Sequence, residues 1–427
     1  MTSGPAPLSR RSIGIAAFST VVEWYDFTLY LYLSTVLSRV FYGGGAASLT
    51  TTLAGFALAY AMRPIGAVVF GHIGDRYGRR RMMLLSMAMM TAAMLAIGLL
   101  PTTAQIGPVA GVLMLLLRCV MAFSVGGEYT GVVAYLLEGA PRDRRGLITS
   151  SASAASEVGG LLAVGISALT VSMMSTDALD DWGWRIPFLV GAAMAGAILL
   201  ARSTMQESPD FERQRHAGTI PSNPLRHSLT HYRAAILRGF AISALGSITY
   251  YVGIAYVPAF LTTTGAMSEQ DSLWLSTLAA VVVILVTPLV GLLTDLKGRK
   301  PVLVAMAIAA MILPTALFMA MGSGSMGQAL LGAALLAAIG GAVSAVGAVA
   351  TAEQFPGEAR LSGLALGATM ATAIFGGVTP WASQVLIERT GWPMIPGAMI
   401  AVVALCVLPI LLRMPETRPR KAAPEDI

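Results

Sequence analysis

Charged residues are scarce in this chain of 427 residues. Asp, Glu, Lys and Arg together make up 12% of it, against about 25% in a typical soluble domain, and hydrophobic residues make up 56%. A water-soluble protein could not cover its surface with so little charge, so the composition excludes a soluble enzyme or regulator. The sequence therefore predicts a membrane protein.

Other features are missing as well. The two cysteines, Cys119 and Cys406, lie far apart in the sequence, so no disulfide framework is indicated. The sequence has no cluster of metal-ligating residues and no phosphate-binding string of Gly, four residues, Gly, Lys and Ser or Thr, which argues against ATP-driven activity. The net charge of +6 comes from dispersed cations. We therefore expect no enzyme activity, no cofactor, no metal and no nucleic-acid partner.

Two short basic strings recur about half the chain apart. They are GHIGDRYGRR at Gly71–Arg80 and GLLTDLKGRK at Gly291–Lys300, and both place Gly, Asp, Gly and two cations at the same spacing. Two matching triplets repeat at nearly the same offset: Glu138, Pro141 and Arg145, then Glu353, Pro356 and Arg360. Parallel repeats of six-helix units, with a substrate site between them, characterise one large transporter architecture. The sequence therefore predicts a duplicated transporter.

The length of the chain sets the number of spans. At about 20 apolar residues per span, it holds roughly twelve helices. We expect them near residues 13–39, 48–74, 82–100, 106–138, 147–175, 185–203, 234–263, 271–294, 300–321, 325–355, 361–387 and 392–413. The predicted fold is thus an all-α membrane protein with twelve transmembrane helices in two six-helix halves. The halves are residues 1–203 and 234–413, with a linker at 204–233 and a tail at 414–427.

The positions of the basic residues predict the orientation. Most of the 28 Lys and Arg residues fall in segments on one side of the predicted spans, and these segments should be cytoplasmic. Both termini then lie in the cytoplasm. The first span has no small-residue cleavage site after it, so it is expected to be a span and not a signal peptide. We expect a multi-pass protein of the bacterial inner membrane, and a monomer.

Ionisable groups inside the predicted spans are candidates for function, because each is costly in hydrocarbon. Glu23 and Asp26 share one face of the first span, and two neighbouring carboxylates repel when both are ionised, which suits a proton carrier. Glu128, beside Gly126 and Gly127, is a third candidate for proton coupling. The alternative is that these carboxylates only pair with cations and hold helices together.

Arg118 lies near the middle of the fourth span, where its planar guanidinium suits either a substrate carboxylate or Asp26. Glu157, among small residues in the fifth span, suits a cation or the positive end of a zwitterion. Tyr25 and Tyr250 complete the predicted substrate contacts. Arg63, at the inner end of the second span, is interpreted as a structural brace.

The repeated basic strings are the predicted gating loops. Asp75 and Asp295 each end a span, where a carboxylate can accept from the N-terminus of a neighbouring helix while the following arginines pair with acidic loop residues. The predicted gating residues are Gly71, Asp75, Arg76, Gly78, Arg79 and Arg80 in the first half and Gly291, Asp295, Gly298 and Arg299 in the second.

Several strings resemble the major facilitator superfamily, and within it the metabolite:proton symporter family. They are EWYDF at 23–27, RPIGAVVFGHIGDRYGRR at 63–80, FSVGGEYTG at 123–131, DWGWRIPF at 181–188, EQFPGEAR at 353–360 and IFGGVTP at 374–380. The resemblance covers nearly the whole chain and implies alternating access with solute and proton carried together. It also implies coupling roles for Glu23, Asp26, Arg118 and Glu128. Met121 and Ala122 replace the family's usual Gln-Gly, so the cavity wall is expected to differ.

The resemblance leaves the substrate open. The strings at 123–131 and 249–261 are similar to proline/betaine transporters, whereas ATAIFGGVTP at 371–380 is similar to citrate transporters. We predict a proton symporter that imports a small carboxylate-bearing metabolite, and favour organic acids such as citrate or dicarboxylates. The alternative substrates are compatible solutes such as proline or glycine betaine. A non-transporting membrane receptor or scaffold is the alternative class.

Overall fold

The structure is a computed structural model that describes residues 10–77, 79–126, 128–129, 132–133, 137, 142–204, 224–323, 325–355 and 360–418. All regular structure in these ranges is helical. The predicted all-α class is therefore confirmed. The long apolar stretches form helices because a helix satisfies its own backbone hydrogen bonds, which a membrane interior requires.

The first half contains the helices up to Ser203. They are α1 (Arg10–Tyr32), α2 (Ser34–Tyr42), α3 (Ala46–Tyr60), α4 (Met62–Tyr77), α5 (Arg79–Gly98), α6 (Thr103–Ile106), α7 (Val109–Ser124), η1 (Arg142–Arg144), α9 (Arg145–Met173), α10 (Thr176–Ala178), η2 (Leu179–Gly183) and α11 (Arg185–Ser203).

The second half begins after α13 (Pro224–His231), a short helix inside the segment predicted as a linker. Its elements are α14 (Arg233–Tyr250), η3 (Tyr251–Ala255), α15 (Val257–Thr263), α16 (Glu269–Lys297), α17 (Arg299–Met321), α18 (Met326–Ala352), α19 (Arg360–Leu364), η5 (Ala365–Thr369), α20 (Met370–Thr372), η6 (Ala373–Val378), α21 (Thr379–Thr390) and α22 (Ile395–Arg413).

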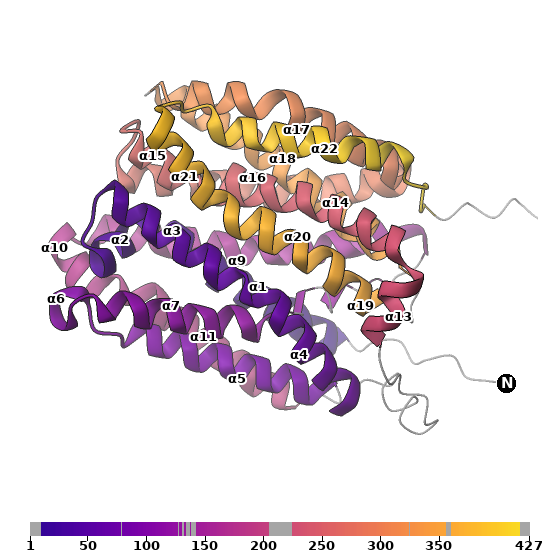
Figure 1. Ribbon diagram of the computed structural model, residues 1–427, viewed down its shortest axis with the longest axis horizontal. Helices are drawn as coiled ribbons and strands as arrows, with labels where there is room; N and C mark the ends of the chain where they lie inside the picture. Colours follow the sequence, from indigo (N-terminus) through magenta and orange to yellow (C-terminus); the bar gives the residue numbers. More distant parts are fainter. Residues whose placement is uncertain are drawn as a thin grey trace, which may run out of the picture.

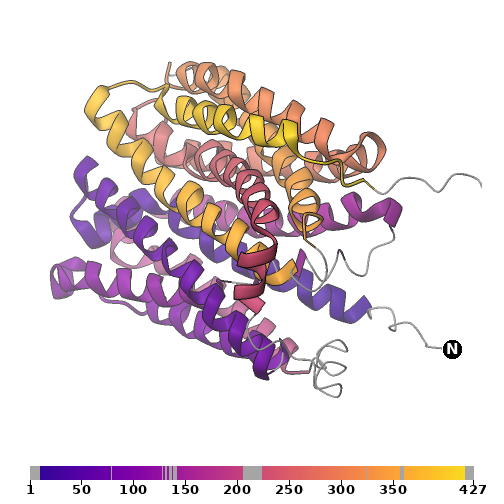
Figure 2. The ribbon, with the colours of Figure 1, turned by 45° about the vertical axis from the view of Figure 1, so that its right-hand side comes forward.

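The two halves lie side by side as two groups of roughly parallel helices (Figures 1 and 2). In Figure 1 the helices of the first half lie mostly below those of the second, and α9 packs against both α1 and α16. The helices α13 and α19 and the end of α22 lie at one end of the bundle, which we call the tail end. The helices α6, α10 and α15 lie at the opposite end, which we call the Arg39 end.

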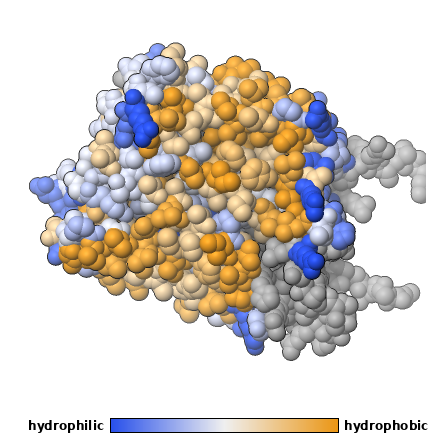
Figure 3. Space-filling view, in the orientation of Figure 1, coloured by the Kyte–Doolittle hydropathy of each residue, from blue (hydrophilic) through white to orange (hydrophobic). Residues whose placement is uncertain are grey.

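The surface of the bundle is that of a membrane protein. Ten helical stretches in the described residues are long and apolar enough to cross a membrane. Two further predicted spans correspond to α1 with α2, which are separated at Leu33, and to the stretch that begins with α7. Hydrophobic side chains cover most of the middle of the face shown in Figure 3, and strongly hydrophilic ones gather toward its ends.

Two spans of the second half are interrupted by π-helical turns. The seventh span passes through a π-helical turn at η3, and the eleventh passes through two, at η5 and η6. Such turns rotate the side chains that follow them and often occur at functional sites. Here η3 and η6 place Tyr251 against Gly376, where an added Cβ would lie 2.7 Å from the tyrosine ring. The interrupted spans therefore contact each other at these turns.

Candidate functional site

A cavity of about 140 Å³ lies between the two halves. The first half lines it with Trp24, Arg63 and Tyr129, and the second half lines it with Tyr250 and Tyr251 together with serine and threonine side chains of α14, α18 and η5. Among the described residues that line this cavity, Arg63 is the one charged side chain. A cavity of this size and lining suits a small solute with both apolar and polar groups.

Aromatic rings form the wall of the cavity around Trp24. The ring centre of Trp24 lies 5.6 Å from that of Tyr129, 5.1 Å from that of Tyr250 and 6.4 Å from that of Tyr251. The rings of Tyr129 and Tyr250 are close to perpendicular to the indole. These rings come from both halves of the protein, so their arrangement depends on how the halves meet.

Arg63 anchors the polar side of the cavity. One of its terminal nitrogens lies 2.5 Å from Glu23 Oε1, and the other donates to the Tyr60 hydroxyl at 2.7 Å. Its guanidinium carbon lies 3.9 Å from the ring centre of Phe27, a cation–π contact. The Tyr60 hydroxyl is in turn hydrogen-bonded to that of Tyr251 in the second half. Arg63 thus links the cavity to a buried carboxylate and to the opposite half.

Three buried polar atoms at this site have no hydrogen-bond partner among the described residues: Trp24 Nε1, Arg63 Nε and Glu23 Oε2. Two of them are N–H donors on side chains that line the cavity. Leaving a donor unpaired in a protein interior costs about 1–3 kcal/mol, so such groups usually have a partner in the functional state. The cavity therefore has donors available for an anionic group.

A close helix contact places Arg63 in this position. A Cβ added to Gly126, after α7, would lie 2.3 Å from the Arg63 carbonyl oxygen, so only glycine lets α4 come this near. The sequence signal for this contact is the pair of glycines in the string FSVGGEYTG, which indicates a close helix contact but not its partner.

Arg118 and Asp26 form a separate, sealed ion pair. Arg118 Nη1 lies 3.3 Å from Asp26 Oδ1, and the two side chains are 2% and 0% exposed. The Arg118 guanidinium also lies over the Tyr30 ring. Neither charged side chain lines the cavity. Of the two carboxylate partners expected for Arg118, the structure shows Asp26, and the role of Arg118 as a substrate clamp stays a prediction.

The other predicted site residues of the first half, Tyr25, Glu128 and Glu157, are not part of the cavity lining. Tyr25 is buried and donates to the Pro187 carbonyl at 2.6 Å, so it packs against α11 and does not line the cavity. Glu128 pairs with Arg202 and accepts from Ser86 at 3.0 Å. Glu157 is buried and has no ion pair among the described residues. Of the predicted substrate contacts, only Tyr250 lines the cavity.

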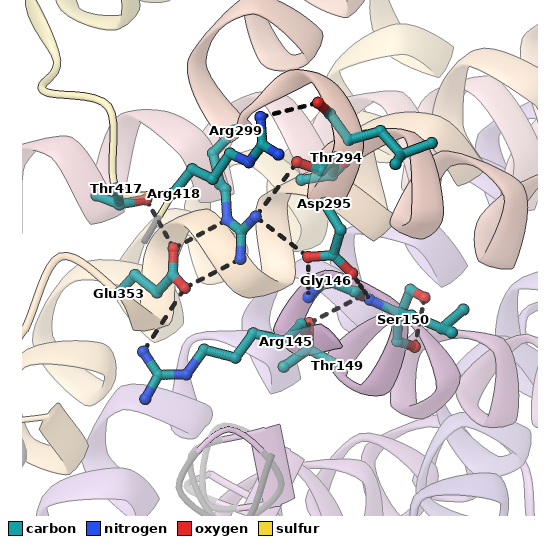
Figure 4. Close-up of polar contacts among 12 residues, drawn as sticks. Arg145, Gly146, Thr149, Ser150, Thr294, Asp295, Arg299, Glu353, Thr417 and Arg418 are labelled. Atoms are coloured by element: carbon teal, nitrogen blue, oxygen red, sulfur yellow. Dashed lines mark hydrogen bonds and ion pairs between the residues drawn. The ribbon is translucent and has the colours of Figure 1, made fainter. Parts of the chain in front are cut away.

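Asp295 joins the two halves at the tail end (Figure 4). Its two oxygens accept from the backbone N–H groups of Gly146 and Leu147, both at 2.9 Å, at the first turn of α9. Arg299 lies 3.1 Å from Asp295 and 3.1 Å from Glu353. This geometry is the one that the sequence spacing predicted, a carboxylate at a neighbouring helix N-terminus beside an arginine paired with an acidic residue. Its role in gating stays a proposal.

The corresponding string of the first half is less fully described. Gly78 lies outside the described residues, as do the side chains of Asp75, Arg76 and Arg79. Gly71 lies within α4. Arg80 is exposed and donates to the Ser203 carbonyl at 2.6 Å. The gating assignments in this string therefore remain predictions.

Two family descriptions match the two halves in turn. Residues 13–218 match "Sugar (and other) transporter", and residues 239–427 match "Major Facilitator Superfamily". The ectoine/proline transporter ProP of Corynebacterium glutamicum is 32% identical over 93% of this chain and 82% of its own length. The citrate-proton symporter of Klebsiella pneumoniae is 32% identical over 91% of this chain and 87% of its own length.

The chain belongs to the major facilitator superfamily. Within the superfamily it groups with the metabolite:proton symporters, and the proline/betaine transporter of Escherichia coli K12 is 29% identical over 97% of this chain and 85% of its own length. It is a multi-pass membrane protein of a transporter family and not an enzyme. A solved structure of the proton:xylose symporter XylE covers 96% of both chains with a TM-score of 0.76 at 20% identity, which shows the shared fold.

This major facilitator fold also joins its halves at the Arg39 end. Arg39 Nε lies 2.8 Å from Asp180 in the first half, and Arg39 Nη1 lies 3.3 Å from Glu269 at the start of α16. Thr50 donates to Glu388 at 2.6 Å, which links α3 to α21. The cavity is thus flanked at both ends of the bundle by contacts between the halves.

Sequence reasoning missed most of the residues that line or support the cavity. Trp24 and Tyr251 lie inside strings that were singled out, but aromatic residues in a span are more often simple packing. Arg63 was interpreted as a brace because it precedes a proline near the end of a predicted span. The pairing of Glu353 with Arg299 had one signal, since Glu353 belongs to the repeated triplets.

The tail of this transporter is tied to the Asp295 network. Glu416 accepts from the backbone N–H groups of Arg299 at 2.9 Å and Lys300 at 3.0 Å, the first residues of α17, and Thr417 donates to Glu353 at 2.7 Å. Burial alone would raise the pKa of Glu416, but the backbone donors and the Arg299 guanidinium outweigh it and hold the pKa below its usual value.

We expect Glu416→Gln to destabilise the protein by about 1 kcal/mol, since it removes a charged cap from a helix N-terminus. Because the folded protein lowers the pKa of Glu416, its stabilisation is present above the usual range of a glutamate and is lost as the pH falls through the lowered value. Thermal unfolding in detergent at neutral and acidic pH measures both effects. Asp143→Asn, at an exposed pair with Arg144, should change nothing. A Glu416→Gln variant as stable as the parent at neutral pH would contradict the capping role.

Proposed function

We propose that the chain is a proton-coupled symporter of small zwitterionic solutes, such as proline or glycine betaine, that works by alternating access. The observation that carries this proposal is the lining of the cavity. One wall is aromatic and includes Trp24 with its unpaired indole N–H, the other side holds the Arg63 guanidinium with an unpaired Nε–H, and no carboxylate of the described residues lines the cavity. A solute with one cationic and one anionic end matches both walls.

The aromatic wall would hold the positive end. Tryptophan and tyrosine rings attract ammonium groups through their faces, by about 0.5–2 kcal/mol each depending on desolvation. Glu157 lies behind this wall, because Tyr129 is hydrogen-bonded to Ser153 at 3.2 Å and the Tyr250 hydroxyl lies 3.0 Å from a Cβ placed on Gly160. Residues 153, 157 and 160 share one face of α9. A carboxyl group behind the rings favours a cation in front of them.

Arg63 and Trp24 would hold the carboxylate of the solute. Both line the cavity, and both carry an N–H donor without a partner in the described residues. A guanidinium and an indole N–H are suitable donors for a carboxylate oxygen. In this proposal Arg63 takes the clamp role that the sequence analysis gave to Arg118.

Small organic acids are the second candidate. The citrate-proton symporter matches this chain at the same identity as the ectoine/proline transporter, and several relatives carry proline or betaine in their names. The cavity favours the zwitterion, because a di- or tricarboxylate would bring two or three negative charges to a space whose described lining has one guanidinium, already paired with Glu23.

Contacts at the two ends of the bundle suggest how access alternates. Asp295 joins the halves at the tail end and the Arg39–Glu269 pair joins them at the other, so opening either end requires the halves to separate there. The excess of Lys and Arg in the predicted loops favours the tail end as the cytoplasmic side of a bacterial inner membrane. A non-transporting scaffold would have no use for three buried ion pairs that are costly to keep in a membrane.

Uptake by the purified protein in liposomes tests the proposal. We expect an inward proton gradient to drive accumulation of proline or glycine betaine, and little accumulation of citrate, α-ketoglutarate or shikimate. Empty liposomes and liposomes without a gradient are the controls. Gradient-driven accumulation of an acid in preference to the zwitterions would overturn the substrate class. Accumulation that ignores the proton gradient would overturn the coupling.

A further inference from the structure

The guanidinium of Arg63 both lines the cavity and pairs with a buried carboxylate. Arg63 lines the cavity, where it has an unpaired Nε–H donor, and the same guanidinium neutralises Glu23 at 2.5 Å. The side chains of Arg63 and Glu23 are 8% and 1% exposed. Asp26 with Arg118 and Glu128 with Arg202 are also paired, but none of their arginines lines the cavity. Among the described residues, Arg63 is therefore the buried cation that lines the cavity and that a solute can reach.

We propose that the carboxylate of the substrate competes with Glu23 for Arg63, and that Glu23 then takes up the transported proton. The inference rests on the proposed symport of a zwitterion. When the substrate carboxylate pairs with Arg63, Glu23 is left as a buried anion without its cation, a state that costs several kcal/mol in a membrane interior. A proton on Glu23 removes that charge.

Other groups near Glu23 do not replace Arg63 as its partner. Arg202 faces Glu23 from α11 but pairs with Glu128, so the two charges offset each other. Asp26, three residues further along α1, is paired with Arg118. Among the described residues, the other titratable neighbours of Glu23 are tyrosines: Tyr60 on α3, Tyr129 after α7 and Tyr251 on η3. Glu23 Oε2 has no hydrogen-bond partner in the described residues, so it has an oxygen free to receive the proton.

Because of this competition, substrate binding and proton binding strengthen each other, as symport requires. Substrate binding favours the proton on Glu23, and by reciprocity a proton on Glu23 frees Arg63 and strengthens substrate binding. The Arg63–Glu23 pair re-forms when substrate and proton leave. If only the substrate or only the proton is bound, either Glu23 or Arg63 is left as an unpaired buried charge. That cost opposes the conformational change that carries the bound site across the membrane.

The first test is proton uptake by the unmodified protein. Purified protein in weakly buffered detergent should take up protons from solution when proline or glycine betaine is added, as reported by a pH-sensitive dye. Substrate affinity should rise by about tenfold from mildly alkaline to mildly acidic pH, a typical coupling between two linked sites. No proton uptake on addition of a substrate that the protein transports would overturn the inference.

The second test uses Glu23→Gln, which mimics the protonated acid. In liposomes this variant should still exchange substrate in counterflow without a gradient, but should lose gradient-driven accumulation and substrate-induced proton uptake. Glu157→Gln is the matched control, a buried acid behind the aromatic wall, and should lower affinity while keeping both proton responses. Gradient-driven accumulation by Glu23→Gln at the parental level would overturn the inference and leave the symport itself intact. Absence of accumulation by the parent protein would instead overturn the proposed function.

Discussion

Arg63→Gln is expected to lower substrate uptake by about 30-fold or more, because truncating one member of a buried charged pair costs about 2–5 kcal/mol. Arg63 is the one charged side chain among the described residues that line the cavity, and it also donates to Tyr60 and neutralises Glu23. The variant would remove the anchor for a substrate carboxylate. Initial rates of proline or glycine betaine counterflow in liposomes, with no proton gradient imposed, measure this loss of binding separately from proton coupling.

Loss of folding could imitate this result, so a second variant separates the two causes. Glu23→Gln with Arg63→Gln removes both charges and should recover the stability that the single Arg63→Gln variant loses. It should not recover binding, since the guanidinium is still missing. Arg233→Gln is the control for loss of an exposed arginine and should transport normally. Binding by the double variant at the parental affinity would show that Arg63 does not hold the substrate.

The sequence predicted the fold because span length and hydrophobicity are properties of local segments. The repeated strings predicted the Asp295 contact, since a carboxylate that ends a helix needs donors and a neighbouring helix N-terminus offers them. The break between α1 and α2 at Leu33 was not predicted. No proline or glycine lies at this position, so the hydropathy of the sequence predicts one continuous span.

The choice between Arg63 and Arg118 could not be made from the sequence. Both arginines lie in spans, and the sequence gives their depth but not the direction in which each side chain points. That direction depends on how helices pack, here on the contact of Gly126 with the backbone of Arg63 and on the contact of Arg118 with the Tyr30 ring. The aromatic wall was missed for the same reason, because its rings come together from three separate segments of the chain.

Asp26→Asn is expected to lower stability by about 3–5 kcal/mol, because it leaves the Arg118 guanidinium buried without its counter-ion. Arg118 and Asp26 are 2% and 0% exposed, so water cannot replace the lost partner. Removing both charges, as in Asp26→Asn with Arg118→Gln, should recover most of the loss. Thermal unfolding of the purified variants in detergent, compared with the parent, measures both effects.

The result also decides whether Asp26 can serve as a proton site. An ionised Asp26 stabilises the protein through its pair with Arg118, so its loss must be costly, and a costly pair is poorly suited to open at every transport cycle. Glu23 differs, because its partner Arg63 lines the cavity, where in our proposal a substrate carboxylate takes the place of Glu23. An Asp26→Asn variant as stable as the parent would mean that the Asp26–Arg118 attraction contributes little. Asp26 would then be free to take up a proton, which would favour the coupling role predicted for it from the sequence.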